Sequence, residues 1–165
     1  MHLRKLNFIG SILLFVLLCS CDDKQFFSEY KKLDGTWKVT DTLKYSFEQK
    51  DSINPYNLFL NLRNNNDYPF NNLYVIVTLK EPGLQPTIKI DTLEYQMALP
   101  DGTLLGEGFS DVKESKLWYL ENYKFPKKGI YKVNVVQAVR ATGSINGITE
   151  LNGITELGLR IEKTN

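Results

Sequence analysis

The residues with the clearest chemical role lie near the start of the chain, where a cysteine follows an apolar segment. Two basic residues precede the mostly apolar run 6–18, which is shorter than the roughly 20 residues that a membrane-spanning helix requires. The run leads into Leu-Cys-Ser-Cys at 18–21, the spacing of a lipobox. In such a motif the thiol accepts a diacylglyceryl group. The sequence therefore predicts a lipoprotein signal peptide over 1–20 and lipid attachment at Cys21, in preference to an ordinary secretory signal with an incidental cysteine.

Loss of the signal peptide would also remove reactive side chains from the mature protein. His2, which is the only histidine, and Cys19 would leave with it, and Cys21 would carry lipid. Without imidazole or free thiol, Ser-His-Asp and Cys-His catalysis and zinc sites built on those ligands are excluded. The 20 basic residues would fall to 18 against 19 acidic ones, so nothing indicates nucleic acid as a partner. Carboxylate pairs, Lys, Tyr and Ser-Lys arrangements remain as groups that could do chemistry.

Four carboxylates lie close together in a glycine-containing loop, namely Asp101, Glu107, Asp111 and Glu114. They lack the Asp-x-Asp-x-Asp-Gly rhythm of an EF-hand calcium loop. A glycosidase pair would need two of them to face one cleft, and segment 100–109 does not have the spacing of a phosphate loop. We interpret them as exposed loop carboxylates near a bulged hairpin. Asp101 is retained as a candidate contact for a ligand or partner, and no metal site is expected.

Aromatic residues gather in the segment that follows, with Trp118 and Tyr119 at its centre. Strand alternation would place Trp118 on one face with Leu120, and Tyr119 on the other face with Glu121. Aromatic side chains line sugar-binding surfaces, but they also fill sandwich cores and protein interfaces. We favour a role in the core or in protein contact over a glycan platform, and take Trp118 and Tyr119 as candidate contacts.

These residues must be positioned by strands, because apolar and polar residues alternate over most of the chain. The expected strands are 36–48, 56–62, 73–79, 87–99, 116–125, 129–139, 145–151 and 157–161. The run 73–79 is nearly all apolar, which is typical of a strand buried on both faces. A change of phase near Asp91 and Thr92 predicts a bulge or bend. Turn-forming residues separate the segments and no sustained 3.6-residue period occurs, so we expect an all-β fold, a single antiparallel β-sandwich of jelly-roll-like or Ig-like Greek key type.

The expected domain division is a signal peptide at 1–20, a lipidated tether at 21–34 and the β-sandwich domain at 35–165. The tether contains Phe26 and Phe27 and lacks the composition of a flexible linker, so we expect it to dock on the domain. The hexapeptide Asn-Gly-Ile-Thr-Glu-Leu occurs twice within 146–157. Two copies are too few for a solenoid, and we interpret them as a hairpin turn followed by a turn or bulge.

Several blocks of the sequence together resemble the gliding-motility lipoprotein H (GldH) family of the Bacteroidota. The blocks are Tyr-Asn-Leu-Phe-Leu-Asn-Leu-Arg-Asn at 56–64, Tyr-Pro-Phe-Asn-Asn-Leu-Tyr at 68–74, Asp-Thr-Leu-Glu-Tyr at 91–95, the segment 100–108, and Gly-Ile-Thr-Glu-Leu-Gly at 153–158 with Arg-Ile-Glu at 160–162. They run from residue 56 almost to the end of the chain. The lipobox at 18–21 also fits this family.

The resemblance implies a non-enzymatic envelope lipoprotein needed for gliding and for surface machinery tied to type IX secretion. Its partners would be membrane lipid, through acylated Cys21, and other envelope proteins of that apparatus. The resemblance implies neither a cofactor nor catalytic residues. Outer membrane is expected over inner membrane, with the membrane face left open. A carbohydrate-binding β-sandwich module on the envelope is the alternative.

Overall fold

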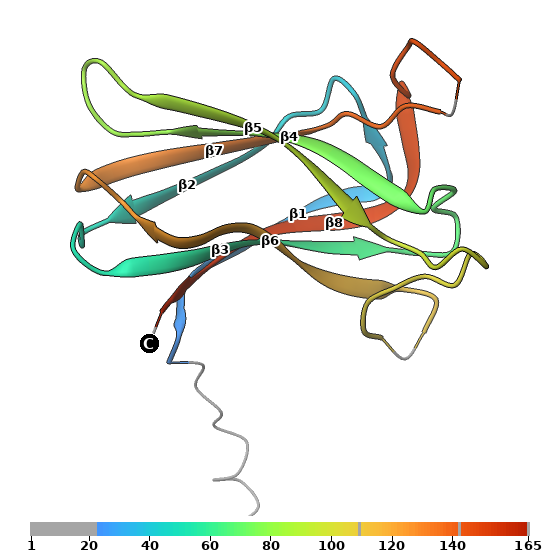
Figure 1. Ribbon diagram of the computed structural model, residues 1–165, viewed down its shortest axis with the longest axis horizontal. Coiled ribbons are helices and arrows are strands. Elements are labelled where there is room, and N and C mark those ends of the chain that lie inside the picture. Colours follow the sequence, from blue (N-terminus) through green and yellow to red (C-terminus); the bar gives the residue numbers. More distant parts are fainter. Residues whose placement is uncertain (1–22, 109, 142, 165) are drawn as a thin grey trace, which may run out of the picture.

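The computed structural model describes residues 23–108, 110–141 and 143–164. This part of the chain forms eight strands in two four-stranded sheets (Figure 1). The strands are β1 (Gln25–Lys38), β2 (Leu43–Gln49), β3 (Pro55–Asn64), β4 (Asn72–Lys80), β5 (Ile88–Gln96), β6 (Lys113–Lys124), β7 (Gly129–Gln137) and β8 (Glu150–Lys163). Sheet A has the order β1-β8-β3-β6 and sheet B has the order β2-β7-β4-β5.

Every pair of neighbouring strands is antiparallel, and the chain crosses between the sheets at every connection except the β4–β5 hairpin. Two four-stranded sheets linked in this way make the double-sheet arrangement of a jelly roll. The prediction of an all-β antiparallel sandwich is confirmed. Of the two expected types, the strand order is that of the jelly roll.

The core lies between the sheets, where alternate side chains of the strands interdigitate. In β2 the inward residues are buried and the intervening ones exposed, and β4 contributes Val75 and Val77, both fully buried. The Tyr45 hydroxyl crosses the core and donates a 2.7 Å hydrogen bond to the carbonyl oxygen of Leu157 in the opposite sheet. A buried tyrosine therefore joins the two sheets without leaving its polar atom unpaired.

The segment expected as a tether differs from the prediction, because β1 begins at Gln25 and pairs with β8. The reason lies in its two aromatic residues. Phe26 and Phe27 pack against Phe47, with ring centroids 6.3 and 5.4 Å apart, and close the end of the core. Only one side of β1 is paired, and residues 26–31 are all half-buried whether polar or apolar. This part of the strand therefore lacks the alternation that would have marked it.

Three other local expectations are wrong. The segment 36–48 is divided between β1 and β2 by a turn in which the amide of Asp41 donates to the carbonyl oxygen of Lys38. The strand β4 is buried on one face only. The pairing of β5 with β4 is regular through Asp91 and Thr92, without a bulge.

The two C-terminal segments expected as separate strands meet in one strand, β8, which contains all of 157–161 and only the last two residues of 145–151. The second copy of the hexapeptide lies inside it. The pairing of β8 with β3 shifts register between Arg63 and Asn64, opposite this copy. The bulge that was one of the two expected outcomes therefore occurs, but within a continuous strand.

Candidate functional site

The outer face of sheet A carries a connected set of charged and aromatic side chains. Each of the four strands contributes outward-pointing residues, and the register aligns them in rows across the sheet. The members are Tyr30 of β1, Phe59, Asn61 and Arg63 of β3, Glu114, Lys116 and Trp118 of β6, and Glu156, Gly158, Arg160 and Glu162 of β8. Strands far apart in the sequence thus build one surface.

The middle row is made possible by a glycine. Gly158 pairs with Tyr30 on one side and with Asn61 on the other. A Cβ atom at Gly158 would lie 2.9 Å from carbon atoms of the Tyr30 ring, so only glycine lets this ring lie across β8. The Tyr30 hydroxyl then accepts a 2.9 Å hydrogen bond from Asn61 Nδ2 and donates one of 2.9 Å to Glu114 Oε1. Burial raises the pKa of Tyr30 above its ordinary value.

The next row is organised by Arg63. Its guanidinium donates from Nε to Glu114 Oε2 and from Nη1 to Glu156 Oε2, each at 2.6 Å. The same group lies 4.7 Å from the centre of the Tyr30 ring. Hydrogen bonding to Glu114 is the main reason that the pKa of Arg63 is raised. Two carboxylates, one cation and one ring therefore hold each other in place, which is the geometry of a preorganised polar surface.

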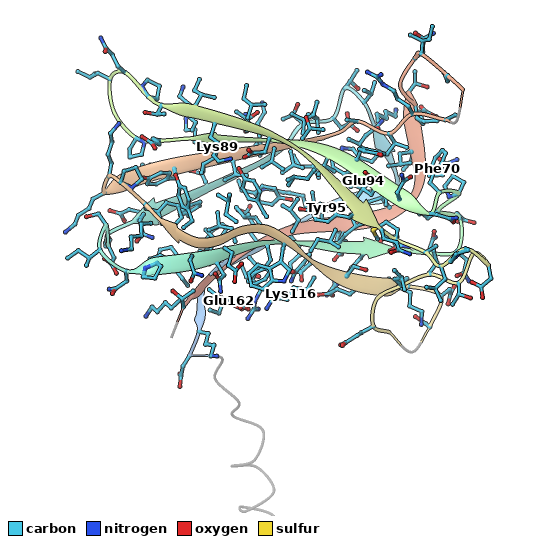
Figure 2. The ribbon with its side chains drawn as sticks, in the orientation of Figure 1. Phe70, Lys89, Glu94, Tyr95, Lys116 and Glu162 are labelled. Carbon is cyan, nitrogen blue, oxygen red and sulfur yellow. The ribbon has the colours of Figure 1, made fainter. Side chains whose placement is uncertain are left out.

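The third part of the face combines aromatic rings with an ion pair. Trp118 packs on Phe59 with ring centroids 4.4 Å apart, and Lys116 Nζ lies 4.0 Å from the Phe59 ring centre. Lys116 also donates to Glu162 Oε1 at 2.7 Å, on the side of sheet A that faces away from sheet B (Figure 2). Burial favours a higher pKa for Glu162, but hydrogen bonds from Lys116 and Arg160 outweigh it and lower the pKa.

A hollow of about 690 Å³ lies beside these rows, between sheet A and the loop that precedes β6. It is lined by Asn61, Glu107, Gly108, Glu114, Lys116 and Arg160. Asn61 is almost fully buried, and its Oδ1 atom has no hydrogen-bond partner among the described residues. An unpaired buried acceptor is costly to a folded protein. The outer face of sheet A therefore offers a hollow with charged groups of both signs and an acceptor that a donor group could satisfy.

A second hollow, of about 770 Å³, lies at the end of sheet B. Phe70, Asn72, Glu94 and Gln96 are among its lining residues, and Phe70 and Glu94 are marked in Figure 2. Asn72 Nδ2 donates a 2.9 Å hydrogen bond to Glu94 Oε1, and hydrogen bonds from Tyr74 and Asn72 lower the pKa of Glu94. The side chains that line this second hollow include one carboxylate. The hollow beside sheet A is lined by two carboxylates, two cations and a buried amide, so it carries more charged groups.

The structure separates the three residues expected as contacts. Trp118 is 52% exposed on the outer face of sheet A. Tyr119 is a member of the core, where burial raises its pKa and its hydroxyl donates to Asp91 Oδ2 at 3.1 Å. Tyr119 therefore has the core position that was favoured together with protein contact. Asp101 is exposed in a turn, where its Oδ1 accepts from the amide of Thr103 at 2.9 Å and this hydrogen bond lowers its pKa.

The expected grouping of Trp118 with Leu120 on one face is also wrong. Trp118 pairs with outward Phe59, whereas Leu120 pairs with inward Leu58, because a bulge interrupts the pairing of β6 with β3 at this point. Of the four loop carboxylates, Glu107 and Glu114 line the hollow beside sheet A, whereas Asp101 and Asp111 do not. The bulge and the turn thus place Tyr119 and Asp101 away from the rows that carry Trp118.

The predicted lipid-attachment residue, Cys21, lies outside the described residues. Among residues 23–108, 110–141 and 143–164, no helix has the length and apolar character needed to cross a membrane. In the same ranges, no group of three or more His, Cys, Asp or Glu side chains is arranged to hold a metal ion.

The charged rows of the outer face were not found from the sequence. Arg63 lies on a different strand from Glu114 and Glu156, which follow it by 51 and 93 positions in the sequence. Their contact depends on the pairing register of three strands, which alternation of apolar and polar residues alone does not give. One signal was present. Gly158 interrupts an apolar strand pattern, and a glycine inside a strand often marks the close approach of another group.

Comparison with solved structures gives only a weak likeness. The infectious bursal disease virus VP2 subviral particle aligns with 86% of this chain and 34% of its own, at 13% identity and a TM-score of 0.39. A likeness of this size bears on neither the function nor the site.

Comparison with protein families and curated sequences gives a close match. The profile of the family described as GldH lipoprotein matches residues 25–161. The gliding motility lipoprotein GldH of Flavobacterium johnsoniae is 52% identical over 148 residues, covering 90% of this chain and 91% of that protein. The gliding motility lipoprotein GldH homolog of Christiangramia forsetii is 48% identical over 158 residues, covering 96% and 94%. With a family match over both sheets and relatives aligned almost end to end, the chain belongs to the GldH lipoprotein family.

Proposed function

We propose that this gliding-motility lipoprotein is a non-enzymatic, membrane-anchored assembly or scaffold component of the gliding apparatus and of the type IX secretion machinery associated with it. Two relatives of about half identical sequence carry gliding-motility lipoprotein names. The observation that carries the scaffold role is the outer face of sheet A. There Trp118 is exposed on Phe59, and Arg63 packs on Tyr30 farther along the same face. These three residue types are the ones enriched at the energetic centres of protein interfaces.

The physical argument concerns preorganisation. Arg63 is fixed by two carboxylates, and Phe59 supports both Trp118 and Lys116 from below. Side chains already held in one geometry lose less conformational entropy when a partner binds. The surface is therefore suited to stable contact with a neighbouring protein.

Lipid on Cys21 would hold this surface at a membrane, and we propose the outer membrane because the inferred role is in surface machinery. The test compares the natural chain with a Cys21→Ala variant in a strain deleted for the gene. The variant should leave the membrane fraction and fail to restore colony spreading and type IX secretion, whereas the natural chain should restore both. Separation of the two membranes by density would show which one holds the natural protein.

The partner surface can be tested by site-specific photo-crosslinking in the native envelope. A crosslinking residue at Trp118, on the outer face of sheet A, should capture a discrete envelope protein. The same residue at Ile90, which is 66% exposed on β5 of sheet B, serves as the control. Equal capture from both positions, or no capture from Trp118, would count against the outer face of sheet A as the interface.

A carbohydrate-binding role is the second candidate, because Trp118 is exposed near a hollow with polar groups. Asn61, Glu114 and Lys116 line that hollow, and an aromatic ring beside hydrogen-bonding groups is suited to a sugar. Binding of envelope oligosaccharides to the natural protein, lost in Trp118→Ala with the fold unchanged, would support this role. A glycan array without binding would remove its basis.

A further inference from the structure

The two ends of the sandwich differ in charge. The three loops β2–β3, β4–β5 and β6–β7 lie at one end together with the start of β1 and the end of β8, on the left in Figure 1. We name this the anchor end and define it by residues 23–25, 49–55, 80–88, 124–129 and 163–164. The opposite end is defined by residues 38–43, 64–72, 96–113 and 137–150. Each range takes in one connection or terminus with its flanking strand residues.

The anchor end is basic and the opposite end is acidic. The anchor end has seven lysines and three acidic residues, and the opposite end has three basic and six acidic residues. All seven lysines of the anchor end are exposed, namely Lys24, Lys50, Lys80, Lys124, Lys127, Lys128 and Lys163. The acidic residues among them are Asp23, Asp51 and Glu81. Lys127 Nζ lies 3.1 Å from Glu81 Oε2, and Lys50 Nζ lies 3.5 Å from Glu48 Oε2. Because these ion pairs involve two of the seven lysines, the anchor end keeps an excess of positive charge.

Hydrogen bonds tie the basic end of sheet A to the point where the chain enters the domain. The amide of Lys163 donates to the carbonyl oxygen of Lys24 at 2.9 Å, and the amide of Thr164 donates to that of Pro55 at 3.3 Å. Pro55 in turn pairs with Lys124. Three lysines and the β2–β3 loop therefore lie in one row beside the start of β1.

The length of chain before β1 limits how far this row can lie from a membrane. The four steps from Cys21 to Gln25 span at most about 14 Å when fully extended. That reach is comparable with the distance over which a charged surface acts, about 10 Å at 0.1 M salt. With lipid on Cys21, the anchor end is held where lysines are attracted to anionic headgroups.

An exposed apolar side chain stands at the tip of the loop in this row. Ile53 is 76% exposed between Lys50 and Pro55. Leu84, at the tip of the β4–β5 loop, is also fully exposed. Apolar side chains are exposed at the opposite end too, with Ile145 at 90%, but that end as a whole carries an excess of acidic residues, which an anionic surface repels. Charge and reach therefore distinguish the two ends.

We propose that the anchor end docks on the headgroup layer of the membrane that holds the lipid, with the β2–β3 loop and its neighbouring lysines as the contact surface. This inference rests on the proposed lipid attachment at Cys21. It fixes the orientation of the domain: the long axis of the sandwich points away from the bilayer, and the loops at 64–72, 96–113 and 137–150, which together carry a net negative charge, are presented to the surroundings.

The test uses the lipidated protein reconstituted in vesicles of phosphatidylethanolamine and phosphatidylglycerol. Since the only other cysteine of the mature chain would be acylated, Ile53→Cys or Ile145→Cys gives one labelling site for a fluorophore. Quenching by lipids that carry a nitroxide on the headgroup should be several-fold stronger at position 53 than at position 145. Equal quenching at the two positions, or stronger quenching at 145, would overturn the orientation.

Charge reversal separates docking from chance proximity. Lys124→Glu should reduce the quenching at position 53, as should high salt or vesicles of neutral phosphatidylcholine, whereas Lys38→Glu at the opposite end should not. If neither Lys124→Glu nor high salt nor neutral vesicles reduced the quenching at position 53, the role of the lysines would be refuted. Flotation of the vesicles tests the anchor itself: protein that does not float refutes lipid attachment, and protein that floats without quenching at position 53 refutes only the docking.

Discussion

Replacing Gly153 by alanine should destabilise the domain strongly, whereas the same change at Gly147 should be nearly neutral. The two glycines occupy equivalent positions in the two copies of the hexapeptide. Gly153 has a φ of +84°, and a Cβ atom there would lie 2.2 Å from the backbone nitrogen of Tyr68. At Gly147 φ lies outside the left-handed region and the nearest atom, the carbonyl oxygen of Val139, would be 3.6 Å away.

The magnitude follows from two costs and one smaller gain. An alanine held at positive φ costs about 1–2 kcal/mol, and forcing extra volume against packed atoms costs about 1–3 kcal/mol. The loop at Tyr68 cannot move away freely, because the amide of Asn65 donates to the carbonyl oxygen of Gly153 at 2.8 Å. Reduced freedom of the unfolded chain returns about 0.4–1 kcal/mol. We expect a net loss of about 3 kcal/mol for Gly153→Ala and less than about 0.5 kcal/mol for Gly147→Ala.

Urea unfolding of the unacylated mature chain, followed by tryptophan fluorescence, measures both changes. With a slope near 2 kcal/mol per molar urea, a loss of about 3 kcal/mol lowers the midpoint by about 1.5 M. Gly147→Ala should leave the midpoint within about 0.3 M of the natural protein. Similar midpoints for the two variants would refute the reasoning, since it assigns their difference entirely to the surroundings of one repeated sequence.

Two further predictions concern the β2–β3 loop and the tryptophans. Asp51 accepts hydrogen bonds from the amides of Ile53 and Asn54, which hold its pKa at about 2, below the ordinary 3.8. Because the folded-state pKa is depressed, its contribution to stability is present above the ordinary value and is lost as pH falls toward 2. The Tm of Asp51→Ala should therefore change less than that of the natural protein between pH 4 and pH 2, and parallel curves would contradict this. Trp37 is fully buried and Trp118 is 52% exposed. The Trp118→Phe variant, which keeps Trp37, should therefore emit blue-shifted fluorescence that acrylamide quenches weakly, and the Trp37→Phe variant should emit red-shifted fluorescence that acrylamide quenches strongly. Equal quenching of the two variants would show that Trp118 is not on the surface.

Most strands could be predicted from the sequence because their inward and outward residues alternate. In β7, Tyr131, Val133 and Val135 are all buried, and Lys132 between them is exposed. Alternation reports whether a residue faces the core, and it therefore also predicted the sandwich. The jelly-roll order could not be chosen over an Ig-like order, because pairing between distant strands leaves no mark on the period of either strand.

The errors at β1 and β8 have a common physical cause. The period of a strand is visible only where one face meets the core and the other meets water. The first half of β1 lies at an edge with both faces half-buried, so it resembled a tether. In β8, Gly153 has a positive φ and lies where the pairing with β1 shifts register, between Asn152 and Ile154, without ending the strand. A bulge inside a strand therefore had the sequence signature of a turn.

The candidate site was predicted only in the position of one residue. Trp118 was expected as a contact and is exposed on the outer face of sheet A. Arg63 and Tyr30 could not be anticipated, because each acts through residues of strands that register alone brings near. A charged residue on the solvent face of a strand gives no sign of whether it is solvated or paired.

The pairing of β1 with β8 has a mechanical consequence. The register joins eleven residues of β1, from Gln25 to Lys38, to partners on β8. Interstrand hydrogen bonds run across the strands, so a force drawn along β1 from an attachment at Cys21 loads these bonds in shear. They would share the tension instead of opening one after another like a zipper. A domain held in this way resists unravelling from its N-terminal end when load is applied along β1.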